Sequence, residues 1–407
     1  MNEAVNEAYE KFRGDDGGKN ADYIPFLANV PSQLFGISVC LPDGEIVEAG
    51  DTDYVFGVES VSKVPTAILA MEQYGPDTVL DQIGADATGL PFNSIMAILL
   101  ENDHPSTPLV NAGAIAACSM VKPVGDASGK WKAITDFLEK LCGSPLVLQD
   151  ELYKSESETN FNNRSIAWLL KNYDRIYDDP DMSLDIYTRQ CSMGVTARQL
   201  SICGGTIANR GVNPVTHERV FDAAITPKIV SMIATVGFYE HTGDWIFSSG
   251  IPAKTGVGGG IVGVLPGVMG IAAFSPKLDG SGNSVRAQHA IKYITNKLGL
   301  NLFGSYLSAS IRRFRTEGVF RSAFFPEPLF MGSFLSPVRI VLTLRNESSD
   351  SSALIFGSSG AGRRERAVRD ELFVFRIDHP ALHGVRDPFF RKSPFFGGLF
   401  HPADVSL

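Results

Sequence analysis

Glu59-Ser60-Val61-Ser62-Lys63 is the stretch that decides how this chain folds and what chemistry it can perform. An apolar segment at residues 64–71 follows it directly and predicts a buried helix. Ser60 and Lys63 are three residues apart, so in a helical turn they share one face and the amine lies within reach of the hydroxyl. A lysine that loses its proton on burial can serve as the base for a serine, and free N–H groups of an opening turn can hold an oxyanion. The stretch therefore predicts an acyl-transfer centre, while an N-capping serine beside a solvated lysine remains the alternative.

The composition excludes several classes of function. With 407 residues, 44% of them hydrophobic and 20% charged, the chain can bury a large core. Its net charge of −9 gives no reason to expect nucleic acid or an anionic membrane as a partner. The longest apolar run, residues 261–274, is interrupted by three glycines and a proline, so we expect no membrane span. The N-terminus lacks the basic start and apolar run of a signal peptide.

Five widely spaced cysteines predict reduced, buried thiols and a cytoplasmic protein. The sequence contains no Cys-x-x-Cys and no His-Glu-x-x-His, and its seven histidines are scattered. We therefore expect chemistry without a metal or another cofactor.

Strand patterns near both ends of the main region predict a single sheet. Residues 35–40 and 45–49 flank a Pro-Asp-Gly turn and predict a hairpin that leads into the Ser60 helix. Residues 250–274 are apolar and punctuated by glycine, which predicts two or three neighbouring strands. Residues 284–298 then predict an amphipathic helix.

Helical patterns dominate between about residues 80 and 228, with clear helices predicted at 131–141, 163–173 and 196–209. We expect an α+β fold in which an antiparallel sheet, built from both ends of the domain and flanked by helices, carries this inserted helical lobe. A site at the junction of sheet and lobe suits that architecture.

The composition changes after residue 303. Residues 304–407 contain thirteen arginines, one lysine, ten acids and 14 of the 26 phenylalanines. We interpret 1–19 as an N-terminal extension, 20–303 as the catalytic domain, and 304–407 as an atypical Arg/Phe-rich extension that is poorly ordered. An interaction module with a basic, aromatic surface is the alternative for this last segment.

A second chemical motif is Lys254-Thr255-Gly256, which precedes three consecutive glycines at 258–260. An amine and a hydroxyl on a strand edge can face an active-site serine, and glycines let a substrate approach the backbone. The glycine string imitates a phosphate loop, but an apolar strand follows it where a nucleotide site requires a helix.

Ser-x-x-Lys early on a helix with Lys-Thr-Gly late on a strand resembles the layout of penicillin-binding proteins and serine β-lactamases. More specifically, the chain resembles the bacterial glutaminases (L-glutamine amidohydrolases) that share this β-lactamase/transpeptidase-like fold. The matching stretches, in order, are residues 21–25 (ADYIP), 59–63 (ESVSK), 91–94 (PFNS), 108–114 (PLVNAGA), 155–156 (SE), 237–239 (GFY), 252–260 (PAKTGVGGG), 275–276 (SP) and 282–284 (GNS).

The resemblance implies hydrolysis of the side-chain amide of L-glutamine to L-glutamate and ammonia, without a cofactor, by a homotetramer or homodimer. It implies that Ser60 is the nucleophile, Lys63 its base and Tyr239 a proton relay, with the backbone N–H groups of Ser60 and Val257 as the oxyanion hole. The residues that it implies around the amino-acid head group of the substrate are Tyr23, Asn111, Glu156, Asn163 and Tyr187.

The residue types agree with the implied roles. A carboxylate at Glu156 suits an α-ammonium, and amide and phenol donors suit an α-carboxylate. Glu156 and Asn163 are seven residues apart, so they share one face if the stretch between them is a continuous helix. The family usually has Arg-Asn where this chain has Asn162-Asn163.

Two other functions fit the same letters. A β-lactamase or penicillin-binding acyl-transferase would share Ser60, Lys63 and Lys254, but it normally acts outside the cytoplasm and carries a Ser-Asp-Asn element that this chain lacks. A catalytically silent amino-acid-binding protein, whose 304–407 segment recruits a partner, would bind glutamine without hydrolysing it.

Overall fold

The computed structural model describes residues 1–100 and 104–304, together with the strands β9 (Ile340–Leu344), β10 (Ala353–Ile355) and β11 (Phe373–Ile377). The chain divides into two compact units, Met1–Phe324 and Phe325–Leu407. In the second unit the three strands form an antiparallel sheet in the order β10-β9-β11. The expectation that 304–407 is poorly ordered otherwise falls outside the described residues.

A five-stranded antiparallel sheet forms the centre of the first unit, in the order β2-β1-β8-β7-β6. Two of its strands come from the N-terminal part and three from the end of the domain, as the sequence predicts. Both faces of the sheet are covered, because every residue of the three middle strands is buried. The strands are β1 (Gly36–Cys40), β2 (Ile46–Gly50), β6 (Ala253–Thr255), β7 (Gly260–Leu265) and β8 (Met269–Phe274).

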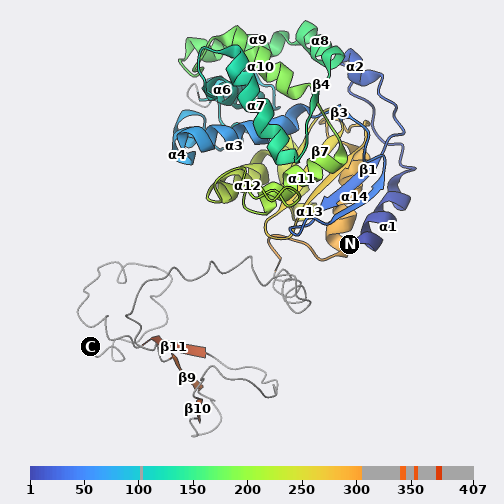
Figure 1. Cartoon of the computed structure of the whole chain (residues 1–407), viewed down its shortest axis with the longest axis vertical. Coiled ribbons are helices and arrows are strands. Elements are labelled where there is room, and N and C mark those ends of the chain that lie inside the picture. Colours follow the sequence, from blue (N-terminus) through green and yellow to red (C-terminus); the bar gives the residue numbers. More distant parts are fainter. Residues whose placement is uncertain (101–103, 305–339, 345–352, 356–372, 378–407) are drawn as a thin grey trace, which may run out of the picture. The chain divides into compact units, whose positions relative to one another are not determined.

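Helices cover the two faces of this sheet as separate layers (Figure 1). On one face lie α1 (Asn2–Phe12) and α14 (Val285–Lys297), which also pack against each other. On the other face α11 (Ala197–Ala208) crosses β1, β7 and β8. Glycines set how closely α11 approaches: a Cβ at Gly270 would lie only 2.0 Å from the backbone nitrogen of Gly205.

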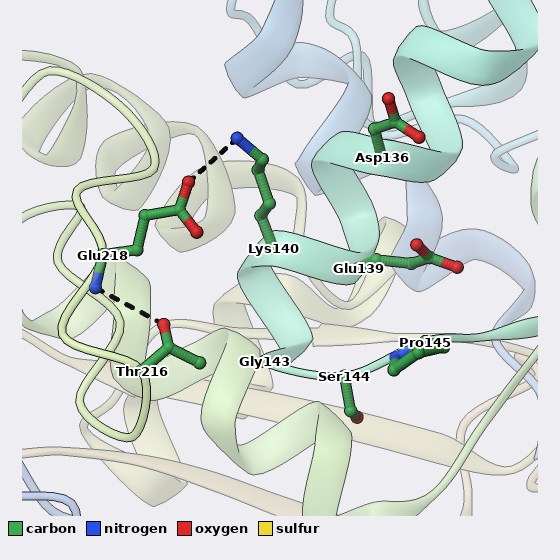
Figure 2. A pocket seen from close by; sticks show the side chains of 8 residues that line it. All are labelled: Asp136, Glu139, Lys140, Gly143, Ser144, Pro145, Thr216 and Glu218. Carbon is green, nitrogen blue, oxygen red and sulfur yellow. Dashed lines mark hydrogen bonds and ion pairs between the residues drawn. The ribbon is translucent and has the colours of Figure 1, made fainter.

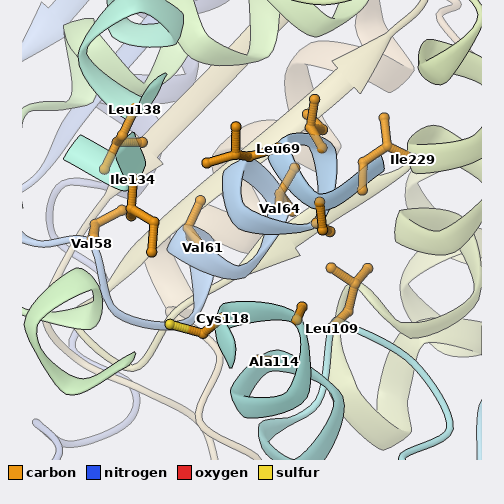
Figure 3. Close-up of a cluster of buried hydrophobic side chains, with 14 of the residues drawn as sticks. Val58, Val61, Val64, Leu69, Leu109, Ala114, Cys118, Ile134, Leu138 and Ile229 are labelled. Carbon is orange, nitrogen blue, oxygen red and sulfur yellow. The ribbon is translucent and has the colours of Figure 1, made fainter. Parts of the chain in front are cut away.

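The helical lobe is built around α3 (Lys63–Tyr74), whose first nine residues are all buried. A helix that is apolar on all sides belongs in a core, and Val64 and Leu69 of α3 lie among side chains of surrounding helices (Figure 3). The predicted buried helix at 64–71 is therefore confirmed. The other elements between residues 25 and 249 are α2 (Pro25–Ala28), β3 (Phe56–Gly57), η1 (Glu59–Ser62), α4 (Pro76–Gln82), α5 (Ile95–Leu100), α6 (Asn111–Met120), α7 (Ala127–Cys142), β4 (Val147–Leu148), α8 (Asp150–Thr159), α9 (Phe161–Asn172), α10 (Pro180–Cys191), β5 (Met193–Val195), α12 (Ile225–Val236), η2 (Tyr239–His241) and α13 (Thr242–Ser249).

The condition for Glu156 and Asn163 to lie on one face of a single helix is not met. Glu156 and Asn163 do not share a continuous helix, because α8 ends and α9 begins at Asn160. The side chain of Asn160 accepts a hydrogen bond from Arg164 Nε at 2.8 Å, inside the first turn of α9. The three helices predicted at 131–141, 163–173 and 196–209 correspond to α7, α9 and α11.

The five cysteines are all buried and unpaired, in agreement with the sequence. Within residues 1–100 and 104–304, no helix combines the length and the apolar character needed to cross a membrane.

Candidate active site

Ser60 and Lys63 meet at the junction between η1 and α3. The Ser60 hydroxyl and the Lys63 amine are hydrogen bonded, with Oγ and Nζ 2.5 Å apart. Both side chains are buried, and three-residue spacing on a helical turn brings them to the same face. The arrangement is that of a nucleophile in contact with a potential base.

The surroundings of Lys63 favour its neutral form. Burial in the lobe lowers the pKa of the Lys63 amine, and nearby Cys191, Glu59 and Glu156 offset this only in part. No carboxylate in the described part of the chain lies within ion-pairing distance of the amine, whereas buried Lys130 pairs with Asp178 at 2.6 Å. A neutral amine can accept the proton of a serine hydroxyl, which a paired ammonium cannot.

In the described part of the chain, the backbone N–H groups of Ser60 and Val257 have no hydrogen-bond acceptor. The segment that follows β6 packs on η1, since a Cβ at Gly256 would lie 3.3 Å from the Ser60 nitrogen. Val257 is the next residue, and within the described residues neither its N–H nor that of Ser60 donates a hydrogen bond. Unpaired, buried N–H groups are costly unless a ligand or water takes them up, and they are the donors that an oxyanion requires.

Tyr239 lies next to Ser60, and Lys254 lies near Lys63. The Lys254 amine lies 4.4 Å from the centre of the Tyr239 ring and donates a hydrogen bond to the Thr255 carbonyl at 2.8 Å. Burial, followed by the charge of nearby Lys63, holds the pKa of Lys254 well below its usual range. Burial raises the pKa of the Tyr239 phenol, although a hydrogen bond with Ser60 opposes this effect. The phenol is therefore a proton donor at neutral pH.

A cavity of about 580 Å³ opens beside this group of residues. Phe92 lines it and stacks at a tilt on Tyr239, with ring centres 4.4 Å apart. Gly282 also lines the cavity and lies against Val257 and Tyr239. The cavity is lined by Tyr23, Ile24, Pro91, Phe92, Asn93, Asn111, Glu156, Thr159, Asn160, Asn162, Asn163, Glu240, Gly280, Ser281 and Gly282.

Three of the predicted head-group residues form one hydrogen-bonded chain. Asn111, the first residue of α6, donates from Nδ2 to Asn163 Oδ1 at 2.9 Å. Its Oδ1 accepts a hydrogen bond from the Tyr187 hydroxyl at 3.2 Å. Tyr187 in turn places its ring 5.6 Å from the Lys63 amine. The chain therefore links the cavity to Lys63, and Asn163 takes part in it despite the break at Asn160.

Glu156 and Tyr23 complete the set. Glu156 faces the cavity from α8, and its Oε1 atom is buried without a hydrogen-bond partner. Tyr23 stands at the rim, 56% exposed. All nine residues to which the resemblance gives a role thus lie in or directly behind one site.

Comparisons with known proteins agree with this geometry. A family model described as glutaminase matches residues 18–303. The glutaminase of Bacteroides thetaiotaomicron is 72% identical over 303 residues, which are 74% of this chain and 94% of the relative. The chain belongs to the glutaminase family.

Solved glutaminase structures share the fold. A structure described as a probable glutaminase has a TM-score of 0.73 at 49% identity, covering 74% of this chain and 97% of that one. The structure of Mglu described as its L-glutamate binding form has a TM-score of 0.71 at 31% identity, covering 74% and 69%. The α+β, β-lactamase-like architecture expected from the sequence is thereby confirmed.

A second cavity, of about 360 Å³, lies away from the glutaminase site (Figure 2). Its walls carry Asp136, Glu139 and Glu218, and Lys140 pairs with Glu218 at 2.9 Å. Ser144 lies in the wall and accepts a hydrogen bond from the Gln199 amide; within the described residues it makes no contact with a lysine amine like that of Ser60 with Lys63.

Sequence reasoning gave no role to two residues of the glutaminase site. Glu59 is buried and directly precedes Ser60, and the ring of Phe92 stacks on that of Tyr239. Both fall inside stretches that match the family, but only their contacts reveal what they touch.

Proposed function

We propose that this glutaminase hydrolyses the side-chain amide of L-glutamine through an acyl-enzyme on Ser60. The observation that carries the proposal is the 2.5 Å contact between Ser60 Oγ and a buried lysine that has no ion-pair partner in the described part of the chain. The relative described as the L-glutamate binding form supports the substrate, since L-glutamate is the product of this hydrolysis.

The chemistry follows from the residues at hand. Ser60 Oγ attacks the γ-carbonyl carbon while its proton passes to Lys63. The N–H groups of Ser60 and Val257 hold the oxyanion, a device worth about 3–4 kcal/mol per donor. As the intermediate collapses, the C–N bond breaks, and Tyr239 relays a proton so that the nitrogen leaves as ammonia. Water then attacks the ester, regenerating Ser60 and releasing L-glutamate.

The head group of the substrate occupies the cavity. Glu156 receives the α-ammonium, because a buried carboxylate oxygen without a partner is suited to a charge-assisted hydrogen bond. Asn111, Asn163, Tyr187 and Tyr23 hold the α-carboxylate and the chain with their amide and phenol donors.

The test is ammonia release from L-glutamine by the purified chain beside its Ser60→Ala variant. We expect turnover by the wild type and a loss of about 10³-fold or more in kcat for the variant, with the fold retained. Normal turnover by Ser60→Ala would refute the acyl-enzyme. Cleavage of a chromogenic cephalosporin without ammonia release would indicate a β-lactamase, and binding of glutamine without hydrolysis would indicate a silent binding protein.

We also propose that the enzyme works in the cytoplasm as a homo-oligomer and that residues 20–303 form its catalytic domain. Five unpaired, buried thiols support a reducing compartment. Light scattering during gel filtration would report a single subunit mass if the oligomer does not exist.

A further inference from the structure

Glu59 has a buried side chain that reaches from the nucleophile turn toward α8. Its backbone adopts φ of +50°, a left-handed conformation that is uncommon for a residue with a Cβ. The side chain runs over the glycines of the β6–β7 segment, since a Cβ at Gly258 would lie 3.1 Å from Glu59 Cγ and one at Gly256 would lie 3.3 Å from Glu59 Cβ. These glycines therefore leave the space that the Glu59 side chain occupies.

The Glu59 carboxyl group ends beside that of Glu156. The two groups are within hydrogen-bonding reach of each other. Each has an Oε1 atom that is buried without a partner, and within the described residues neither carboxyl group forms an ion pair. Glu59 is only 4% exposed, whereas Glu156 borders the open cavity.

Two adjacent buried carboxyl groups without a cation between them cannot both be ionised at modest cost. A shared proton removes the repulsion and supplies the missing hydrogen-bond donor. Burial raises the pKa of both carboxyl groups. The charge of Glu156 and the hydrogen bond with it raise the pKa of Glu59 further, whereas the same hydrogen bond lowers the pKa of Glu156. The more deeply buried acid is thus the one that keeps the proton.

We propose that Glu59 is protonated in the working enzyme and donates a hydrogen bond to Glu156, thereby positioning the carboxylate that receives the α-ammonium of the substrate. This inference rests on the proposed function for the role of Glu156, but the location of the proton does not. Glu59 is a positioning residue, because it acts on the substrate through Glu156.

The location of the proton also matters for Lys63. The charge of Lys63 lowers the pKa of both acids. An ionised Glu59 would favour protonated Lys63 and so remove the base, whereas a neutral Glu59 leaves one negative charge to meet one α-ammonium.

Substitution separates a neutral Glu59 from an ionised one. Glu59→Gln keeps the length and a hydrogen-bond donor without a charge, so we expect kcat/KM within about fivefold of wild type. Glu59→Leu removes the donor, and we expect KM for L-glutamine to rise at least about tenfold with a smaller change in kcat. Glu156→Gln should raise KM at least as much, and Asp136→Asn, an exposed acid of α7 that pairs with Lys132, should leave KM unchanged.

Infrared difference spectra of the full-length protein provide a readout that needs no substrate. We expect a protonated carboxyl band in wild type that disappears in Glu59→Gln. The proposal is overturned if Glu59→Gln raises KM as much as Glu156→Gln does, or if no such band is lost. If the wild type releases no ammonia from glutamine, the proposed function fails while the infrared comparison still decides where the proton lies.

Discussion

Three lysines are buried in the part of the chain that the structure describes. Whether each one has an ion-pair partner distinguishes a structural lysine from one suited to catalysis. Lys130 pairs with Asp178 and also donates to the Ser119 carbonyl at 2.6 Å. Lys63 and Lys254 have no carboxylate within reach, and burial lowers the pKa of both. An unpaired buried amine costs folding free energy, so its presence beside a serine indicates a catalytic use.

Replacing Lys130 or Lys63 by methionine should have different consequences: the first change affects stability and the second affects activity. We expect Lys130→Met to destabilise the fold by about 3–5 kcal/mol, because Asp178 is left as a buried unpaired charge. We expect Lys63→Met to keep the melting temperature and to lose at least about 10³-fold in kcat. Thermal unfolding and ammonia release measure the two effects; a Lys63→Met enzyme with normal turnover would remove Lys63 from the mechanism.

The acid side of the pH profile follows from the same lysine. Burial places the pKa of folded Lys63 below its value of 10.5 in the unfolded chain. The neutral base is present above the folded pKa and is lost as pH falls through it, so kcat/KM should decline toward acid pH. Initial rates across a pH series measure this decline, and a rate that rises on acidification would contradict the assignment of a neutral lysine base.

The stability contributed by Glu59 should be lost as pH rises, whereas the activity that depends on Lys63 should be lost as pH falls. Its folded pKa is raised above 4.5, so the folded state binds a proton that the unfolded state releases as pH rises. This stabilising contribution is complete below pH 4.5 and is lost as pH increases through the folded value. We expect Glu59→Gln to melt at a higher temperature than wild type near pH 8, with a smaller difference near pH 4.5. A difference that grows on acidification would show that Glu59 is ionised in the fold.

At the scale of elements, the contact between α11 and the sheet helps to fix the position of β6, the strand of Lys254. Gly204 and Gly205 lie on the strands so closely that a Cβ at Gly204 would be 2.8 Å from Val262 and 3.2 Å from the Gly263 carbonyl. Val262 and Gly263 belong to β7, which pairs with β6, the strand that carries Lys254. The spacing of α11 therefore influences where Lys254 and Val257 stand relative to Ser60.

A single methyl group at this contact should disturb the layer. Gly270→Ala places its Cβ 2.0 Å from the Gly205 nitrogen, and backbone on both sides leaves no flexible side chain to move. We expect a loss of at least about 3 kcal/mol in the free energy of unfolding. Gly243→Ala is the matched control, since nothing lies within 4 Å of its Cβ and the residue sits in the exposed first turn of α13. It should be neutral or stabilising by about 0.5–1 kcal/mol. Denaturant unfolding compares the two, and equal stabilities would show that α11 can shift freely.

At the scale of the whole molecule, the site needs both ends of the domain. Ser60 follows the β1–β2 hairpin, whereas Lys254 lies about 200 residues later on β6. Val257 follows in the segment that joins β6 to β7, and β7 is connected to β1 through β8. The helical lobe between them supplies Asn111, Glu156, Asn163 and Tyr187. The family match ends at residue 303, and 303 residues of this chain already span 94% of the Bacteroides relative.

A chain that stops after residue 304 should therefore keep the activity. We expect kcat/KM for L-glutamine within about twofold of the full chain, because every residue of the site precedes that point. Ammonia release and the oligomeric mass of both forms are the measurements. A truncated protein that folds but has lost turnover would assign the 304–407 segment a part in catalysis.

The α+β class, the hairpin, the helix after Ser60 and the pairing of Ser60 with Lys63 can all be predicted from the amino-acid sequence, because they depend on spacing of two or three residues and on apolar periodicity. Only the tertiary structure decided the rest. The seven-residue spacing of Glu156 and Asn163 would place them on one face only in a continuous helix. Asn160 separates α8 from α9, and the packing of these two helices brings both residues to the cavity. The absence of an ion-pair partner for Lys63 within the described residues, and the second carboxyl group beside Glu156, arise from residues far apart in the chain. Burial and long-range proximity set these pKa values, and neither is encoded in local sequence.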